Sequence, residues 1–152
     1  YGSKGAIVAA LLSGMENDAD IDGWGARIDA ERDPRRRLRL FADWSAALFS
    51  SSKATIAAVQ SAISDPAIVE LRDQGDRHRR DGVRGLIDGL VAERALRPGL
   101  SPDEALDRAW ILSALEPYLA ATDGCGWTDR RYAEWLGELL GEQLLGPEVR
   151  RS

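Results

Sequence analysis

A set of aromatic and polar side chains at helical spacing is the part of this sequence that could bind a small molecule. Ser113 follows Trp110 by about one helical turn, and Glu116 follows Ser113 by another. Ligand cavities between helices combine apolar walls with a few such polar groups. The predicted cavity residues are Phe41, Trp44, Leu48, Phe49, Gln60, Ile87, Trp110, Ser113 and Glu116. The alternative is that these side chains only fill a core, as aromatic residues at helical spacing usually do.

The sequence offers no pattern typical of catalysis or metal binding. His78 is the one histidine and Cys125 the one cysteine, without the ligand spacing of a zinc site. A nucleophile elbow, a phosphate-binding glycine loop and a cysteine–histidine pair are also missing from the sequence. The charge run at residues 76–81 is interpreted as the solvated face of a helix, and the arginines at 35–37 as surface residues. We therefore expect no enzyme activity, no metal and no cofactor.

Helices must position the candidate residues. Four starts are marked by side chains that can cap a helix: Asp33, Asp65 and Ser101, each followed by proline, and Thr128. Apolar residues then recur every three or four positions, and no sustained alternation of period two is present. The sequence predicts an all-α bundle of about six helices. We expect a loop with a short helical turn over residues 16–33 and a connection over residues 121–126.

Length and composition predict one domain with one core. The chain has 152 residues, of which 44% are hydrophobic and 30% charged. The net charge of −5 argues against this portion binding nucleic acid by itself. No apolar run is long enough to span a bilayer, so we expect no membrane partner, and the single cysteine favours the cytoplasm.

The last helix is apolar over an unusually wide arc, which predicts partners on two sides. One side would pack on the chain's own core, and the other would meet a second copy in an isologous four-helix bundle. The predicted interface residues are Leu112, Leu119, Trp135, Leu136, Leu139, Leu140 and Gln143. The alternative is that the wide arc merely closes the core of a monomer.

The first residues suggest that a helical element precedes Tyr1. A turn glycine and a possible helix cap, Gly2 and Ser3, come directly before an apolar helix at residues 6–12. Lys4 would then lie beside the free N–H groups of a helix N-terminus, an arrangement that suits a phosphate.

Both ends of the chain resemble the tetracycline-repressor-like family of transcription factors. Residues 1–5, Tyr-Gly-Ser-Lys-Gly, followed by Ile-Val-Ala-Ala-Leu at 7–11, are similar to the seam between the recognition helix and the helix that links the DNA-binding head to the core. Glu-Pro-Tyr at 116–118, Gly-Trp-Thr at 126–128 and Tyr-Ala-Glu-Trp-Leu at 132–136 resemble the last two helices of family members. Helix number and order agree over nearly the whole chain, although the match is motif-like only at the two ends.

The resemblance implies three parts: residues 1–3 as the remnant of a helix-turn-helix DNA-binding domain, residues 4–146 as an effector-binding and dimerisation domain, and residues 147–152 as a tail. Lys4 would contact a DNA phosphate, which positions the protein without reading sequence. The expected function is that of a homodimeric transcriptional regulator, most simply a repressor. A small-molecule effector of unidentified structure would change the spacing of two heads on operator DNA.

Two features depart from the family pattern. Most of the DNA-binding head is missing from the sequence. Family members often have a proline earlier in the stretch before the tyrosine, whereas this sequence has its proline at position 117, directly before Tyr118. Pro117 is expected to kink its helix, because it cannot donate to the carbonyl of Ser113. Two other function classes stay open: an all-α interaction or dimerisation module without a DNA or ligand role, and a small helical enzyme.

Overall fold

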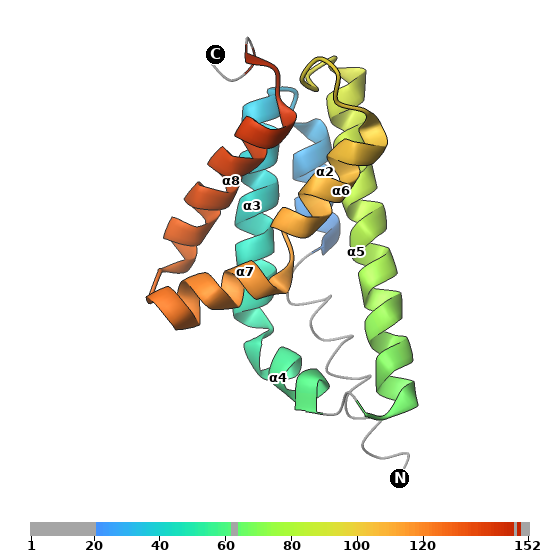
Figure 1. The fold of residues 1–152 in the computed structure, drawn as a ribbon, viewed down its shortest axis with the longest axis vertical. Helices are drawn as coiled ribbons and strands as arrows, with labels where there is room; N and C mark the ends of the chain where they lie inside the picture. Colours follow the sequence, from blue (N-terminus) through green and yellow to red (C-terminus); the bar gives the residue numbers. More distant parts are fainter. Residues whose placement is uncertain (1–20, 62–63, 148, 150–152) are drawn as a thin grey trace.

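The computed structural model describes residues 21–61, 64–147 and 149, and these residues form an all-α bundle (Figure 1). The elements are α2 (Ile21–Ala30), α3 (Pro34–Ser51), α4 (Lys53–Ser61), α5 (Pro66–Ala92), α6 (Pro102–Leu112), α7 (Leu115–Leu119), its π-helical continuation η1 (Ala120–Gly124) and α8 (Asp129–Leu144). The predicted all-α class with about six helices is confirmed. Lys4, residues 1–3 and the expected helix at 6–12 lie outside the described residues.

The predicted capping residues start their helices. Asp33 accepts hydrogen bonds from the backbone N–H groups at the start of α3, and Asp65 does the same for α5. Ser101 accepts from the backbone N–H of Glu104 at 3.2 Å, and Thr128 accepts from that of the third residue of α8 at 3.1 Å. Each bond satisfies an N–H that has no partner within its own helix.

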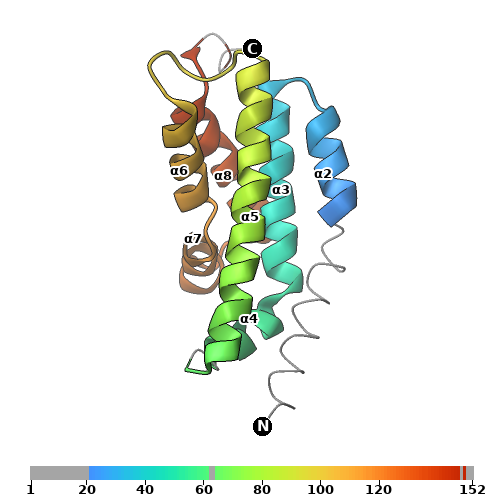
Figure 2. The same ribbon diagram turned by 90° about the vertical axis from the view of Figure 1, so that its right-hand side faces the viewer.

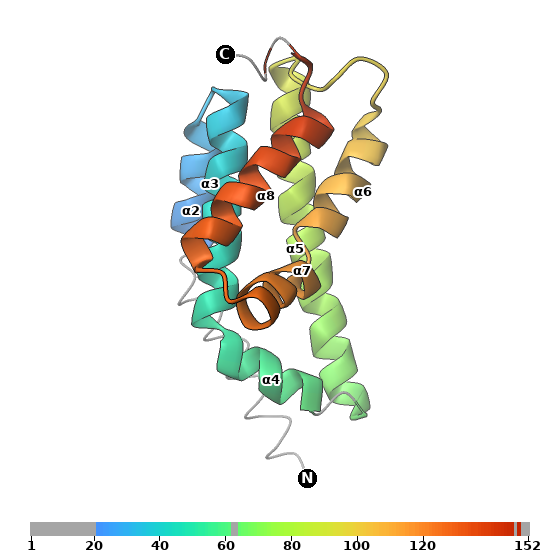
Figure 3. The same cartoon turned by 60° about the vertical axis from the view of Figure 1, so that its left-hand side comes forward.

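Helix α3 lies in the middle of the bundle, with α8 packed along one side of it. Figure 2 shows α3 between the long α5 and the shorter α2, and in Figure 3 α6, α7 and α8 lie in front of α3 and α5. Gly137 of α8 lies against Arg39 and Ala42 of α3, so small residues let these two helices approach closely. At the far end of α8, the backbone N–H of Arg97 donates to the carbonyl of Leu144 at 2.8 Å and ties the α5–α6 connection to α8.

The apolar core has two parts. The larger part joins α3, α5, α6 and α8 through fully buried side chains such as Leu38, Val83, Leu90 and Leu136. The smaller part lies between α4 and the beginning of α5 and consists of Val59 and Ile68 with Leu71 against them. A single predicted core is therefore an incomplete description, because a polar zone lies on α5 between the two parts.

Three local predictions differ from the structure. The expected turn near Trp24 is the helix α2, ten residues long, whose Ile28 is buried one turn after Trp24. The first four residues of the expected connection at 121–126 are π-helical, and Gly126 ends it with a φ of 70°, a conformation that favours glycine. The helix carrying Pro117 is interrupted earlier, at Ser113 and Ala114, so that Pro117 falls in the first turn of α7, where a missing N–H costs no helical bond.

Arg37 also differs from its predicted place at the surface. Only 6% of it is exposed, and its Nε donates to the carbonyls of Ile28 and Glu31 at 3.2 and 2.8 Å. These carbonyls lie at the C-terminal end of α2, where a cation is favoured by the helix dipole. Its neighbours Arg35 and Arg36 are exposed, as predicted.

Candidate functional site

The inward face of α5 changes from apolar to charged halfway along the helix. Val83, Leu86 and Leu90 are buried on this face. Continuing the same helical positions towards the N-terminus leads to Arg79, which is half-buried, and then to Asp76, which is exposed. Charged residues thus continue the apolar stripe of α5 between the two apolar clusters, and this polar zone is the candidate site.

Arg79 is the central residue of the polar zone. Its guanidinium carbon lies 3.7 Å from the centre of the Trp110 ring, and Nη1 donates to the carbonyl and to Oγ of Ser113 at 3.1 and 3.2 Å. These partners are neutral, and Arg79 forms no ion pair with any carboxylate of the described residues. Burial lowers the pKa of Arg79, and the nearby charges of Asp76 and Glu116 only partly oppose this effect.

The break between α6 and α7 explains why Ser113 can accept from Arg79. Pro117 has no N–H to donate to the Ser113 carbonyl, as the sequence predicts, and the guanidinium of Arg79 occupies that position instead. Ser113 Oγ donates back to the carbonyl of Ala109 at 2.6 Å, which orients its lone pairs for Arg79. A residue from the charge run on α5 thereby closes the end of α6.

Tyr132 carries a buried hydroxyl group. Its side chain is fully buried, and the hydroxyl oxygen makes no hydrogen bond in the part of the chain that the structure describes. Burial raises the pKa of Tyr132 above its ordinary value, and the charge of Arg79 acts in the opposite direction. The two groups therefore lie within electrostatic reach of each other. An unsatisfied buried hydroxyl costs free energy unless a ligand or water pairs with it.

The ring of Tyr118 packs against the ring of Tyr132. The two rings meet edge to face, with their centroids 5.1 Å apart. The hydroxyl of Tyr118 donates to Oδ1 of Asp129 at 2.8 Å, which fixes its orientation. Burial first, and then Asp129, raise the pKa of Tyr118 to about 12. The hydroxyl of Tyr118 therefore has a hydrogen-bond partner, whereas the hydroxyl of the neighbouring Tyr132 has none among the described residues.

The structure brings together only some of the predicted cavity residues. Phe41, Phe49, Ile87 and Ser113 are buried, Trp44, Leu48 and Trp110 are half-buried, and Gln60 and Glu116 are exposed. Trp110 and Ser113 both contact Arg79, whereas Glu116 acts on it only through its charge. Phe41 pairs with Trp44 at 6.0 Å, and Phe49 pairs with Tyr118 at 5.3 Å, within the apolar core. Trp44 Nε1 on α3 and Oγ of Ser52, the residue that follows α3, are further buried polar atoms without a partner among the described residues.

Arg79, Asp76 and Tyr132 were not predicted as site residues. Arg79 was assigned to a solvated face, yet it precedes Val83 by four positions and therefore continues the apolar stripe of α5. That spacing was the available signal. Nothing in the sequence shows that the hydroxyl of Tyr132 forms no hydrogen bond with the described residues, because this depends on packing between helices.

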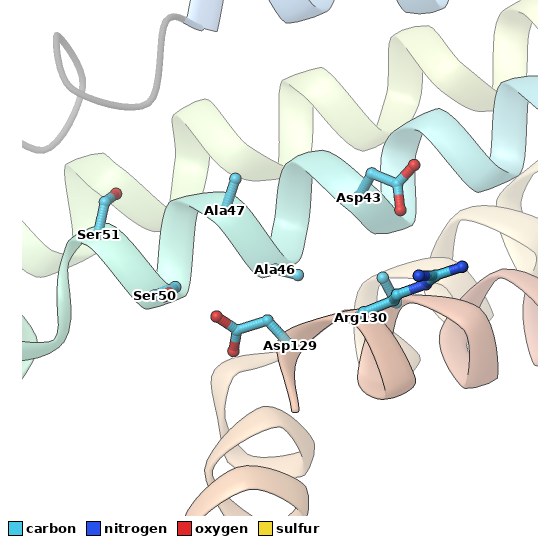
Figure 4. A pocket seen from close by; sticks show the side chains of 8 residues that line it. Asp43, Ala46, Ala47, Ser50, Ser51, Asp129 and Arg130 are labelled. Carbon is cyan, nitrogen blue, oxygen red and sulfur yellow. The ribbon is translucent and has the colours of Figure 1, made fainter. Parts of the chain in front are cut away.

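Two depressions on the surface lie away from this zone. One, of about 390 Å³, lies between α3 and the start of α8 (Figure 4) and is lined by Asp43, Ala46, Ala47, Ser50, Ser51, Asp129, Arg130 and Ala133. A second, of about 810 Å³, is lined by Asp33, Arg35, Arg36, Arg39, Glu134, Gly137, Glu138, Gly141, Glu142 and Pro147. None of the predicted cavity residues lines either depression.

The predicted interface residues of α8 divide between two faces. Leu136 and Leu140 are fully buried in the core of their own chain, so they offer no surface to a second copy. Trp135 is 37% exposed, and Leu139 and Gln143 are half-buried on the same side of α8. This correction follows from helical geometry, since the wide apolar arc contains a core-facing side and an outer side.

The outer side of α8 adjoins α6. Arg108 of α6 donates to the carbonyl and the Oε1 atom of Gln143 at 3.3 and 3.4 Å, so Gln143 already has a partner within its own chain. Leu112 and Leu119 are half-buried, and Ile111, which the sequence analysis did not select, is 65% exposed. We use the term outer face for Ile111, Leu112, Trp135 and Leu139.

Comparison of the chain with protein families, with curated proteins and with solved structures finds no match in any of the three. Among the described residues, no helix is both long and apolar enough to cross a membrane. The same part of the chain contains no group of three or more His, Cys, Asp and Glu side chains that could hold a metal ion.

Proposed function

We propose that this chain is the effector-binding and dimerisation core of a tetracycline-repressor-like transcriptional regulator of the cytoplasm. The observation that carries the ligand-binding part is the polar zone: Arg79 interrupts the apolar face of α5 and has only neutral hydrogen-bond partners, and the buried hydroxyl of Tyr132 has none among the described residues. Replacing buried polar groups by apolar residues is often neutral or stabilising, so the presence of these groups supports a ligand-binding role. The DNA-binding part rests on the motifs at both ends of the sequence, and Lys4 is proposed to contact a DNA phosphate.

The outer face supports the proposal of a homodimer. Exposed Ile111 and Trp135 lie on neighbouring helices, and each apolar side chain that a second copy covered would contribute roughly 1.5–3 kcal/mol. In this proposal, ligand in the polar zone changes the arrangement of the two copies and hence the separation of two DNA-binding heads. Ligand and DNA would oppose each other through a coupling free energy of about 1–3 kcal/mol.

Light scattering of the purified chain tests the dimer. We expect a mass of twice the 16.6 kDa of one chain, and we expect Ile111→Glu to reduce it to that of one chain, because a buried carboxylate without a partner is costly. Val91→Glu is the matched control, since Val91 is an exposed apolar residue, 42% exposed, that lies on α5 and is not one of the residues of the outer face. A monomeric wild-type chain, or a dimer that both variants leave intact, would contradict the proposed arrangement.

A further inference from the structure

The larger of the two surface depressions has walls of opposite charge. It has a volume of about 810 Å³ and lies between the start of α3 and α8, and we call it the α3–α8 groove. The charged residues that face each other across it are three arginines of α3 and three glutamates of α8: Arg35, Arg36 and Arg39, and Glu134, Glu138 and Glu142. The groove is therefore positive along one side and negative along the other.

An ion pair joins the two walls at one end of the groove. Nη2 of Arg39 lies 3.8 Å from Oε1 of Glu134. Further along, Arg35 and Glu138 form no ion pair within the part of the chain that the structure describes. The ion pair of Arg36 is with the N-cap carboxylate of its own helix, at 3.9 Å, and leaves 76% of its side chain exposed. Charges on both walls are thus available to a partner.

Gly141 leaves part of the groove wall without a side chain. It lies inside α8, where glycine is less favourable than alanine by about 1 kcal/mol. A Cβ at this position would have no described atom within 4 Å, so packing within the chain does not explain the glycine. A partner lying in the groove would explain it, because glycine lets another chain approach the backbone of α8 closely.

A second copy of this chain matches the charges of the groove. Helices α3 and α8 run antiparallel (Figure 1), and the pair of Arg39 with Glu134 fixes their relative height. Arg36 lies three residues before Arg39, and Glu138 lies four residues after Glu134, so both lie about 5–6 Å beyond that pair. A twofold axis along the groove places the α3 wall of one copy opposite the α8 wall of the other at the same height. Arg36 of each copy then faces Glu138 of the other.

We propose that the α3–α8 groove is a second self-association surface of this chain, in which Arg36 of each copy pairs with Glu138 of the other across a twofold axis. This contact is separate from the outer face and goes beyond the proposed regulatory function. Exposed ion pairs contribute little individually, so the association is weak and depends on salt. In a chain that pairs through the outer face, the groove joins dimers in pairs.

The test measures molar mass against protein concentration by light scattering. It uses the full chain with Ile111→Glu, so that the outer face does not contribute. At about 0.1 M salt the Debye length is about 10 Å, so charges in contact attract each other. The repulsion between two whole chains of net charge −5 is then largely screened. We expect the mass to rise towards twice its starting value with concentration, and the rise to vanish at about 1 M salt.

Charge reversals test the pairing itself. Arg36→Glu and Glu138→Arg should each weaken the association about 10-fold or more, because each brings like charges together twice in the symmetric contact. Glu138→Arg also makes the net charge less negative, so general repulsion predicts the opposite result. A one-to-one mixture of the two variants should associate like the parent, since both contacts are then attractive. Arg84→Glu is the matched control, because Arg84 is exposed on α5 and does not line the groove. It should associate like the parent.

The outcomes are distinct from those for the outer face. A constant mass of the parent at about 0.1 M salt would overturn the second surface, and so would association that survives both reversals. Failure of the mixture to associate, with both variants folded by circular dichroism, would overturn the twofold pairing. The outer-face dimer is decided separately at about 1 M salt, where the groove is screened, by comparing the wild type with Ile111→Glu.

Discussion

Replacing Gly89 by alanine should destabilise the protein, although alanine is the better helix former. Gly89 lies on α5 directly against the guanidinium of Arg37. An added Cβ would overlap Nη1 of Arg37 and would lie 3.1 Å from its Cζ. The end of an arginine can usually move aside, but here Nε is hydrogen-bonded to two carbonyls at the end of α2 and the side chain is buried.

The size of the effect follows from two opposing terms. Alanine in a helix gains about 1 kcal/mol over glycine. Displacing the guanidinium of Arg37 loses hydrogen bonds from a charged donor, which contribute about 1.5–3 kcal/mol, and leaves the carbonyls of Ile28 and Glu31 without that donor. We therefore expect Gly89→Ala to lower the free energy of unfolding by about 1 kcal/mol or more, a decrease of roughly 2–4 °C in melting temperature for a chain of this size.

Gly85 provides the matched control one turn earlier on the same helix. No atom lies within 4 Å of the place where its Cβ would be, so Gly85→Ala should raise the free energy of unfolding by about 1 kcal/mol. Both variants are measured by thermal and urea unfolding, followed by circular dichroism. In an Arg37→Ala background, Gly89→Ala should become stabilising as well. Equal stabilisation by the two alanines in the wild-type background would refute the argument, because it would show that Arg37 yields without cost.

Two further predictions concern ionisation. Burial raises the pKa of Tyr118 to about 12, and burial also raises the pKa of Tyr132 above its ordinary value. The contribution of the two tyrosines to stability is therefore complete below pH ~10 and is lost as the pH rises further. Absorbance at 295 nm should therefore show no ionisation of these two tyrosines before unfolding; their titration near pH 10 in the folded protein would argue against burial. Burial likewise raises the pKa of Asp76 above 3.8, so its charged form opposes folding and stability declines as the pH rises through the folded-state pKa. Asp76→Asn should be more stable than the wild type at pH 7 and not at pH ~3.5, and a less stable variant in melts at pH 7 would contradict this.

Local sequence signals predicted the helices and their starts, because each depends on a few neighbouring residues. Asp33 and Ser101 cap helices that begin where a side-chain acceptor precedes a proline. The same kind of reasoning placed Arg37 at the surface and was wrong there, because its burial depends on glycine at position 89 and on the open carbonyls of α2, both distant in sequence. The residue pattern within one helix does not show which groups of a neighbouring helix its side chains will contact.

In the candidate site, too, features that depend on neighbouring residues were predicted and contacts between distant residues were not. The sequence identified Trp110, Ser113 and the missing N–H of Pro117, all of which act within one segment of the chain. It did not identify Arg79, whose hydrogen bonds to Ser113 span 34 positions. Likewise, the wide apolar arc of α8 was evident, but its division into core-facing Leu136 and the outer Trp135 depends on where α3 and α6 lie.

Helix α6 connects the polar zone to the outer face within four consecutive residues. Trp110 and Ser113 lie on one side of the helix and contact Arg79, whereas Ile111 is 65% exposed and Leu112 is half-buried on other sides. A ligand that draws the guanidinium of Arg79 towards itself would weaken its bonds to Ser113 and loosen the junction between α6 and α7. Under the proposed function, this junction links the polar zone to the contact between two copies. Arg79→Met, which removes the bonds to Ser113, should therefore change the dimer dissociation constant measured by light scattering, whereas Arg77→Met, whose side chain is exposed and pairs with Glu70, should leave it unchanged.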